Sequence, residues 1–175
     1  MLFLTCNLQP KMTVINTMLV ALAACALVAD LLKPPKQPTF DLYDMCRVSE
    51  LSGANEMKLR QESYRDMSRW TRLYGIDLPA VGKPGYSGAR QDLEVILGRS
   101  PDVYVEDEKP DHPVTRNATW VQYVWTRGKL IQFEVLQDGW ATVNEEGRKG
   151  RYGKYLVGAE TEAKRLHEGI WEKAN

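Results

Sequence analysis

The sequence predicts an α+β fold with one hydrophobic helix in front of it. Segments with strand character come first along the chain and helical segments follow, as expected where strands and helices are segregated in one domain. Ahead of both, residues 13–32 form an apolar run of about the length that crosses the hydrocarbon core of a bilayer. With 175 residues, the chain is long enough for one domain with its own core and an appendage.

The apolar run TVINTMLVALAACALVADLL is predicted to be an uncleaved single-pass membrane helix. Its only strongly polar members are Asn16 and Asp30, and Asp30 lies near the end, where the interface can hydrate it. The sequence KPPK follows and ends the helix. A cleaved secretory signal and a lipoprotein signal around Cys25 are alternatives, but a secretory signal has a charged start and a shorter apolar core.

This interpretation divides the chain into an N-terminal segment at 1–12, a transmembrane helix at 13–32, a linker at 33–39 and a folded domain at 40–175. Three small residues on the predicted helix, Ala21, Ala24 and Ala29, would let a neighbouring helix approach closely. We therefore expect the helix to dock against other subunits within the bilayer.

Composition and charge argue against two classes of protein. The 23 Lys and Arg residues balance 23 Asp and Glu residues, whereas a nucleic-acid binder usually carries a positive excess. Nucleic acid is therefore not the expected partner. The three cysteines, Cys6, Cys25 and Cys46, are odd in number and irregularly spaced, which indicates neither a disulfide framework nor a zinc site.

Within the domain, hydrophobic periodicity and turn residues predict the individual elements. A polar insert is expected at 49–69, with a turn at 53–55, and an acidic loop at 106–113. The expected strands or extended pieces lie at 40–48, 70–76, 103–105, 120–125 and 140–143, and the expected helices lie at 89–97 and 155–168. Residues 130–133 flank the turn at 126–129 as the second arm of a hairpin with 120–125, and the chain can become helical over 131–138.

Three segments resemble the thermonuclease (staphylococcal nuclease) family. The first is RLYGIDLP at 72–79. The second runs from YVW at 123–125, through a glycine turn and an apolar helix, to GWA at 139–141. The third runs from the helix at 159–164 to GIW at 169–171. They occur in the family's order and cover roughly residues 40–171. The resemblance implies an OB-fold five-stranded β-barrel with about three helices.

The resemblance also implies a calcium-dependent phosphodiesterase site. In such a site carboxylates hold the cation, a glutamate positions the attacking water, and two arginines neutralise transition-state charge. Arg72 matches the first arginine and Asp77 matches one metal ligand. Ala80 replaces the glutamate, Thr119 replaces the second arginine, and Cys46 falls at the other metal position. A methyl group cannot activate water, and a thiol is a poor calcium ligand.

These departures predict a pseudo-nuclease in which Arg72 and Asp77 are vestigial. The predicted function is that of a membrane-anchored accessory or structural subunit of a larger membrane complex. A mitochondrial inner membrane is one location that suits such a subunit. No cofactor is expected, and calcium only if the protein is active.

Two alternative functions stay open. The first is an active membrane-tethered, calcium-dependent nuclease that hydrolyses DNA or RNA. The second is a non-catalytic nucleic-acid-binding OB module. In that case Trp120, Trp125 and Trp140 would stack bases, although filling the core or helix–barrel contacts is their more common role.

Overall fold

A computed structural model describes residues 33–40, 45–61, 67–98, 101–109, 115–116 and 119–172. The predicted transmembrane helix at 13–32 and its small residues Ala21, Ala24 and Ala29 lie outside these ranges. Within the described ranges, no helix is both long and apolar enough to span a bilayer.

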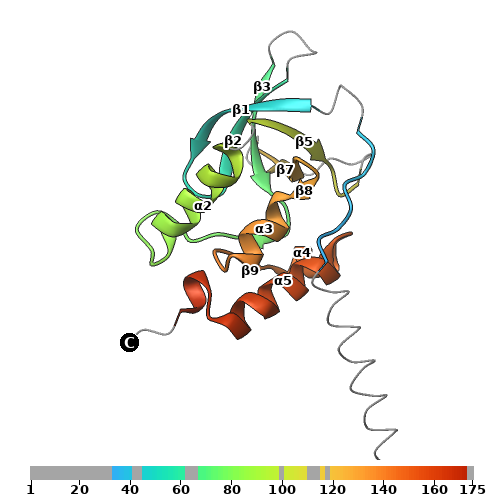
Figure 1. Cartoon of the computed structure of the whole chain (residues 1–175). Helices are drawn as coiled ribbons and strands as arrows, with labels where there is room; N and C mark the ends of the chain where they lie inside the picture. Colours follow the sequence, from blue (N-terminus) through green and yellow to red (C-terminus); the bar gives the residue numbers. More distant parts are fainter. Residues whose placement is uncertain are drawn as a thin grey trace, which may run out of the picture.

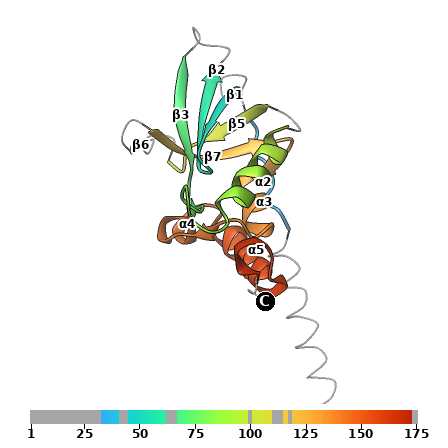
Figure 2. The same ribbon diagram turned by 90° about the vertical axis from the view of Figure 1, so that its left-hand side faces the viewer.

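Five strands close a barrel (Figures 1 and 2). Strands β1, β2 and β3 form an antiparallel meander, and β5 pairs antiparallel with both β1 and β7. A parallel pairing of β3 with β7 completes the ring. This confirms the predicted five-stranded barrel of OB type. The strands are β1 (Met45–Ser52), β2 (Glu56–Gln61), β3 (Ser68–Leu73), β5 (Asp102–Glu106) and β7 (Thr119–Thr126).

Strand β2 lies inside the polar segment 49–69, where no strand was predicted. The predicted turn at 53–55 is present, and it connects β1 to β2. In β2 only Met57 and Leu59 point into the barrel, where both are fully buried. The alternate positions carry polar side chains toward solvent, which is the pattern of a strand with one wet face.

The helices gather at one side of the barrel (Figures 1 and 2). All three predicted helices are present, with bounds shifted by a few residues. A small two-stranded sheet of β4 and β9 lies among them, and β6 (Thr115–Arg116) and β8 (Lys129–Leu130) extend the main sheet. The remaining elements are α2 (Tyr86–Gly98), α3 (Ile131–Gln137), α4 (Glu145–Lys149), α5 (Gly153–Leu166), η2 (Gly169–Trp171), β4 (Ile76–Asp77) and β9 (Thr142–Val143).

The core fills the space between barrel and helices. Trp125 on β7 is fully buried there, and Trp140 packs its ring against Gly88 of α2. These two tryptophans therefore serve packing, as expected. Trp120 differs, because it is only partly buried and lies at the open end of the barrel.

The family-like segments hold the domain together through backbone contacts. Gly75, in the turn between β3 and β4, has φ of 78° and touches Gly147 of α4 so closely that neither has room for a Cβ. The Ile170 N–H donates to the Gly139 carbonyl at 2.9 Å, which joins the second family-like segment to the third. Part of the resemblance therefore reflects the packing of the fold.

Residues 33–40 run along the surface of the domain (blue in Figure 1). Pro35 is buried. The Phe40 ring stacks on Tyr104 at 5.1 Å between ring centroids and lies 6.4 Å from the Trp125 ring. The predicted linker at 33–39 therefore follows a defined path against the barrel.

Candidate functional site

A shallow cavity of about 340 Å³ lies at the end of β3 that carries the family-like residues. The β1–β2 turn forms one wall, and the chain after β4 forms the other. Arg72 projects between them, and Tyr86 at the start of α2 closes the end. The cavity is lined by Ser52, Gly53, Ala54, Asn55, Glu56, Arg72, Leu78, Pro79, Ala80, Val81 and Tyr86.

Arg72 is held by an acid from the neighbouring strand. The β2–β3 register places Glu56 directly opposite Arg72, and the Arg72 Nη2 atom donates to Glu56 Oε1 at 2.6 Å. The Arg72 Nε atom is buried and has no hydrogen-bond partner among the described residues. The guanidinium charge is thus already compensated, whereas an arginine that stabilises a transition state has to meet developing phosphate charge.

Asp77 points to a different partner. Its carboxylate accepts a hydrogen bond from Asn144 Nδ2 at 3.3 Å, and Asp77 is not among the residues that line the cavity. The Oδ1 atom of the same Asn144 caps α4 by accepting from the Gly147 N–H at 2.9 Å. Asp77 therefore fastens β4 to the start of α4.

The structure brings Ala80 to the Arg72 cavity, but not Cys46 or Thr119. Cys46 is a buried residue of β1 that lines a separate cavity. Thr119 begins β7, and the parallel pairing sets Val121, not Thr119, beside Arg72. The acid opposite Arg72 is Glu56, which the sequence did not reveal because β2 was taken for part of an insert.

The cavity does not fit a calcium ion. Calcium takes six to eight oxygen ligands, several of them carboxylates. Here Glu56 is paired with Arg72, and Asp77 is bonded to Asn144 outside the cavity. Across the described ranges, no three His, Cys, Asp or Glu side chains lie close enough together to hold a metal ion.

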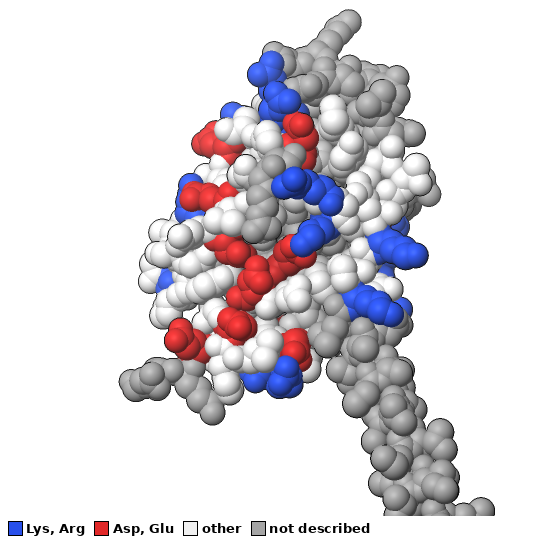
Figure 3. Space-filling view, in the orientation of Figure 1, with Lys and Arg blue, Asp and Glu red and all other residues white. Residues whose placement is uncertain are grey.

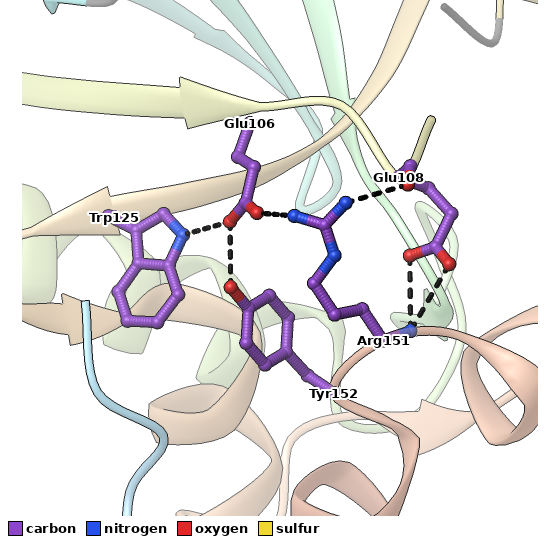
Figure 4. A network of polar contacts seen from close by, with 5 residues as sticks. All are labelled: Glu106, Glu108, Trp125, Arg151 and Tyr152. Atoms are coloured by element: carbon purple, nitrogen blue, oxygen red, sulfur yellow. Dashed lines mark hydrogen bonds and ion pairs between the residues drawn. The ribbon is translucent and has the colours of Figure 1, made fainter. Parts of the chain in front are cut away.

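A largely buried carboxylate organises a second polar cluster (Figure 4). Glu106, at the end of β5, has a side chain that is only 10% exposed. Its Oε2 atom accepts from Trp125 Nε1 at 3.1 Å and from the Tyr152 hydroxyl at 2.9 Å. Its Oε1 atom forms an ion pair with Arg151. The Glu108 carboxylate accepts from the Arg151 backbone N–H.

This cluster is structural, because its charges and donors satisfy one another. Burial and the hydrogen bond to Glu106 raise the pKa of Tyr152, and burial and nearby Glu108 raise the pKa of Tyr123. Both phenols therefore stay protonated at neutral pH. The prediction of an acidic loop at 106–113 was wrong for Glu106, which ends a strand and ties it to the start of α5.

A cavity of about 400 Å³ opens at the end of the barrel where Cys46 lies. Two tryptophans line it, each with a cation over its ring. Lys58 Nζ lies 5.8 Å from the centroid of the Trp70 ring, and Arg69 Cζ lies 4.8 Å from that of Trp120. We call this surface the mouth cavity. Its aromatic and basic side chains are of the kind that bind single-stranded nucleic acid.

Comparison with known proteins identifies one family. The model described as "Staphylococcal nuclease homologue" matches residues 71–173, which is more than half of the chain. The match begins within β3 and continues through η2 to the end of the described residues. Among curated proteins, no significant match to the chain is found.

Proposed function

The chain belongs to the family of staphylococcal nuclease homologues, and we propose that it is a membrane-anchored, non-catalytic member of that family. The observation that carries the proposal is the pairing of Arg72 with Glu56 beside Ala80. The family-type arginine is thus neutralised, and a methyl group stands where a glutamate would position water.

The size of the rate losses expected from the missing catalytic groups favours this proposal over weak catalysis. The loss of a general base, or of one donor to the transition state, lowers rates by roughly 10²–10⁴-fold each. Ala80 stands in place of the general base, and Thr119 stands in place of the second arginine. Asp77 is engaged with Asn144, so the one remaining family carboxylate does not face the cavity. Several such losses together leave no useful turnover.

We further propose that the protein serves as an accessory subunit of a larger membrane complex, with a mitochondrial inner membrane as its location. The apolar run at 13–32 supports the anchor, and the packed path of residues 33–40 supports a domain held close to it. A non-catalytic domain on a single helix has its surface free for assembly.

The assembly test uses two matched substitutions in the full chain. Ala24→Phe places a bulky ring on the predicted small-residue face, and Ala23→Phe places the same ring at least about 100° away from Ala21, Ala24 and Ala29 around the helix. After extraction in mild detergent, native gels should show weaker co-migration of Ala24→Phe with its partners, and normal co-migration of Ala23→Phe. Full co-migration of both variants, or of a form without residues 1–32, contradicts helix docking.

The mouth cavity favours a second candidate function, the binding of single-stranded nucleic acid without cleavage. Bases would stack on Trp70 and Trp120, and Lys58 and Arg69 would meet phosphates. The zero net charge speaks against strong binding. A titration of the protein's tryptophan fluorescence with a single-stranded oligonucleotide at low salt distinguishes the two functions. Saturable quenching that is lost in Trp120→Ala would support nucleic-acid binding, and the absence of quenching would support the accessory subunit.

A further inference from the structure

A cavity of about 360 Å³ lies where residues 33–36 pass the start of α5. Its described lining consists of Lys33, Pro34, Pro35, Lys36, Tyr152 and Tyr155. Lys33 and Lys36 are exposed, whereas Pro35 is buried and holds the segment in place. Lysine and tyrosine side chains on a rigid proline support form a suitable pocket for a phosphate-bearing headgroup.

The described lining of this cavity contains two lysines and no acidic residue. The exposed Lys154 extends its ammonium over the Tyr155 ring at 4.6 Å, and the first turn of α5 carries no acidic residue. The nearby acids Glu106 and Glu108 are engaged with Arg151. In Figure 3, basic side chains lie at the right-hand edge, on the side where residues 33–40 run in Figure 1, and acidic ones run down the middle of that face.

The position in the chain points to a membrane as the source of the ligand. Lys33 directly follows the apolar run at 13–32, and four residues of extended chain span at most about 14 Å. The polar headgroup layer on each side of a bilayer is about 5–8 Å thick. If residues 13–32 cross a bilayer, as the proposed function requires, the cavity opens at the level of the headgroups or just above it.

We propose that this cavity binds the headgroup of an anionic phospholipid and thereby fixes the orientation of the domain on the membrane. Lys33 and Lys36 attract the phosphate, and the Tyr155 ring lies at the interface, where tyrosine is favoured. Pro35 and Phe40 hold the lysines in position against the barrel.

The test uses the full chain in nanodiscs of phosphatidylcholine, with and without phosphatidylserine. Hydrogen exchange is followed at the start of α5 and, for reference, in α2. Phosphatidylserine should slow exchange at the start of α5 by roughly tenfold, because each lysine near an anionic surface adds several-fold to its occupancy. The double variant Lys33→Gln/Lys36→Gln should lose this effect, and Lys58→Gln/Lys83→Gln, with the same charge change elsewhere, should keep it.

Other outcomes overturn the proposal. If inorganic phosphate gives the same protection in discs of phosphatidylcholine alone, the cavity is a general anion site and not a lipid site. If the chain floats with phosphatidylcholine vesicles but phosphatidylserine does not slow hydrogen exchange at the start of α5, the proposed headgroup site is wrong and the membrane anchor is supported. If the chain does not float with vesicles at all, the anchor fails and the headgroup site fails with it.

Discussion

At the scale of single residues, the family-type side chains of this protein take structural roles. Arg72 pairs with Glu56 across two strands, and Asp77 bonds to the residue that caps α4. Side chains that would act on a phosphodiester in an active nuclease here join neighbouring elements. Their presence therefore does not require catalysis.

Glu106 and Glu56 each pair with an arginine, but the Glu106 side chain is more deeply buried. Removing the charge of Glu106 should therefore destabilise the protein more than removing that of Glu56. Glu106→Gln should lower the free energy of unfolding by about 2 kcal/mol or more, because Arg151 loses its charged partner next to a buried cluster. Glu56→Gln should cost about 1 kcal/mol or less, because its pair with Arg72 is partly exposed. Denaturant unfolding of the full chain in mild detergent measures both; equal effects would contradict the distinction.

The raised pKa values of Tyr123 and Tyr152 predict sensitivity to alkali. A phenol whose folded pKa lies above its unfolded value stabilises the fold fully below the unfolded pKa. That stabilisation is lost as the pH rises toward the folded pKa. Stability should therefore fall above about pH 10, the usual tyrosine value. Tyr152→Phe should make this fall shallower while lowering stability at neutral pH through the lost hydrogen bond to Glu106.

The measurement is the unfolding midpoint of the wild type and of Tyr152→Phe. It is followed from about pH 8 to about pH 11, the range around the pKa of a free tyrosine. Parallel curves for the wild type and Tyr152→Phe would show that Tyr152 does not contribute to the alkaline loss.

At the scale of elements, the strength of the hydrophobic periodicity decided which helices and strands could be predicted from the sequence. Helices α2 and α5 have a clear apolar stripe and were predicted within a few residues. Strand β2 was missed because only Met57 and Leu59 mark its buried face. Missing β2 also hid Glu56, since the partner of Arg72 follows from strand register. The Glu106 cluster depends on Arg151 and Tyr152, which are distant in sequence and carry no local signal.

The contact between Gly75 and Gly147 predicts a position that tolerates no side chain. A Cβ on Gly147 would lie 1.9 Å from the Gly75 carbonyl oxygen, and backbone on both sides cannot move away cheaply. Gly147→Ala should therefore lower the free energy of unfolding by about 3 kcal/mol or more.

Gly98 provides the matched control, because it also lies in a helix but a Cβ there meets nothing within 4 Å. Gly98→Ala should be neutral or stabilise by up to about 1 kcal/mol. Thermal unfolding of the two variants compares them directly, and a Gly147→Ala protein as stable as the wild type would contradict the close backbone packing.

At the scale of the whole molecule, a closed barrel, a layer of helices and a packed N-terminal segment form one body (Figure 1). The barrel and its family followed from three short motifs, because these motifs mark the backbone contacts that close the fold. The path of residues 33–40 did not follow from sequence, since its contacts with Tyr104 and Trp125 depend on tertiary structure. This path is what connects the domain to the proposed anchor.

A nuclease assay of the full chain in mild detergent tests the central claim most directly. Single-stranded DNA and RNA are incubated with calcium and, separately, with a chelator, and an active nuclease added to the same buffer shows that cleavage is detectable. We expect no calcium-dependent cleavage, because Glu56 neutralises Arg72 and Ala80 cannot position water. Calcium-dependent turnover that Asp77→Ala abolishes would contradict the account and identify the protein as an active nuclease.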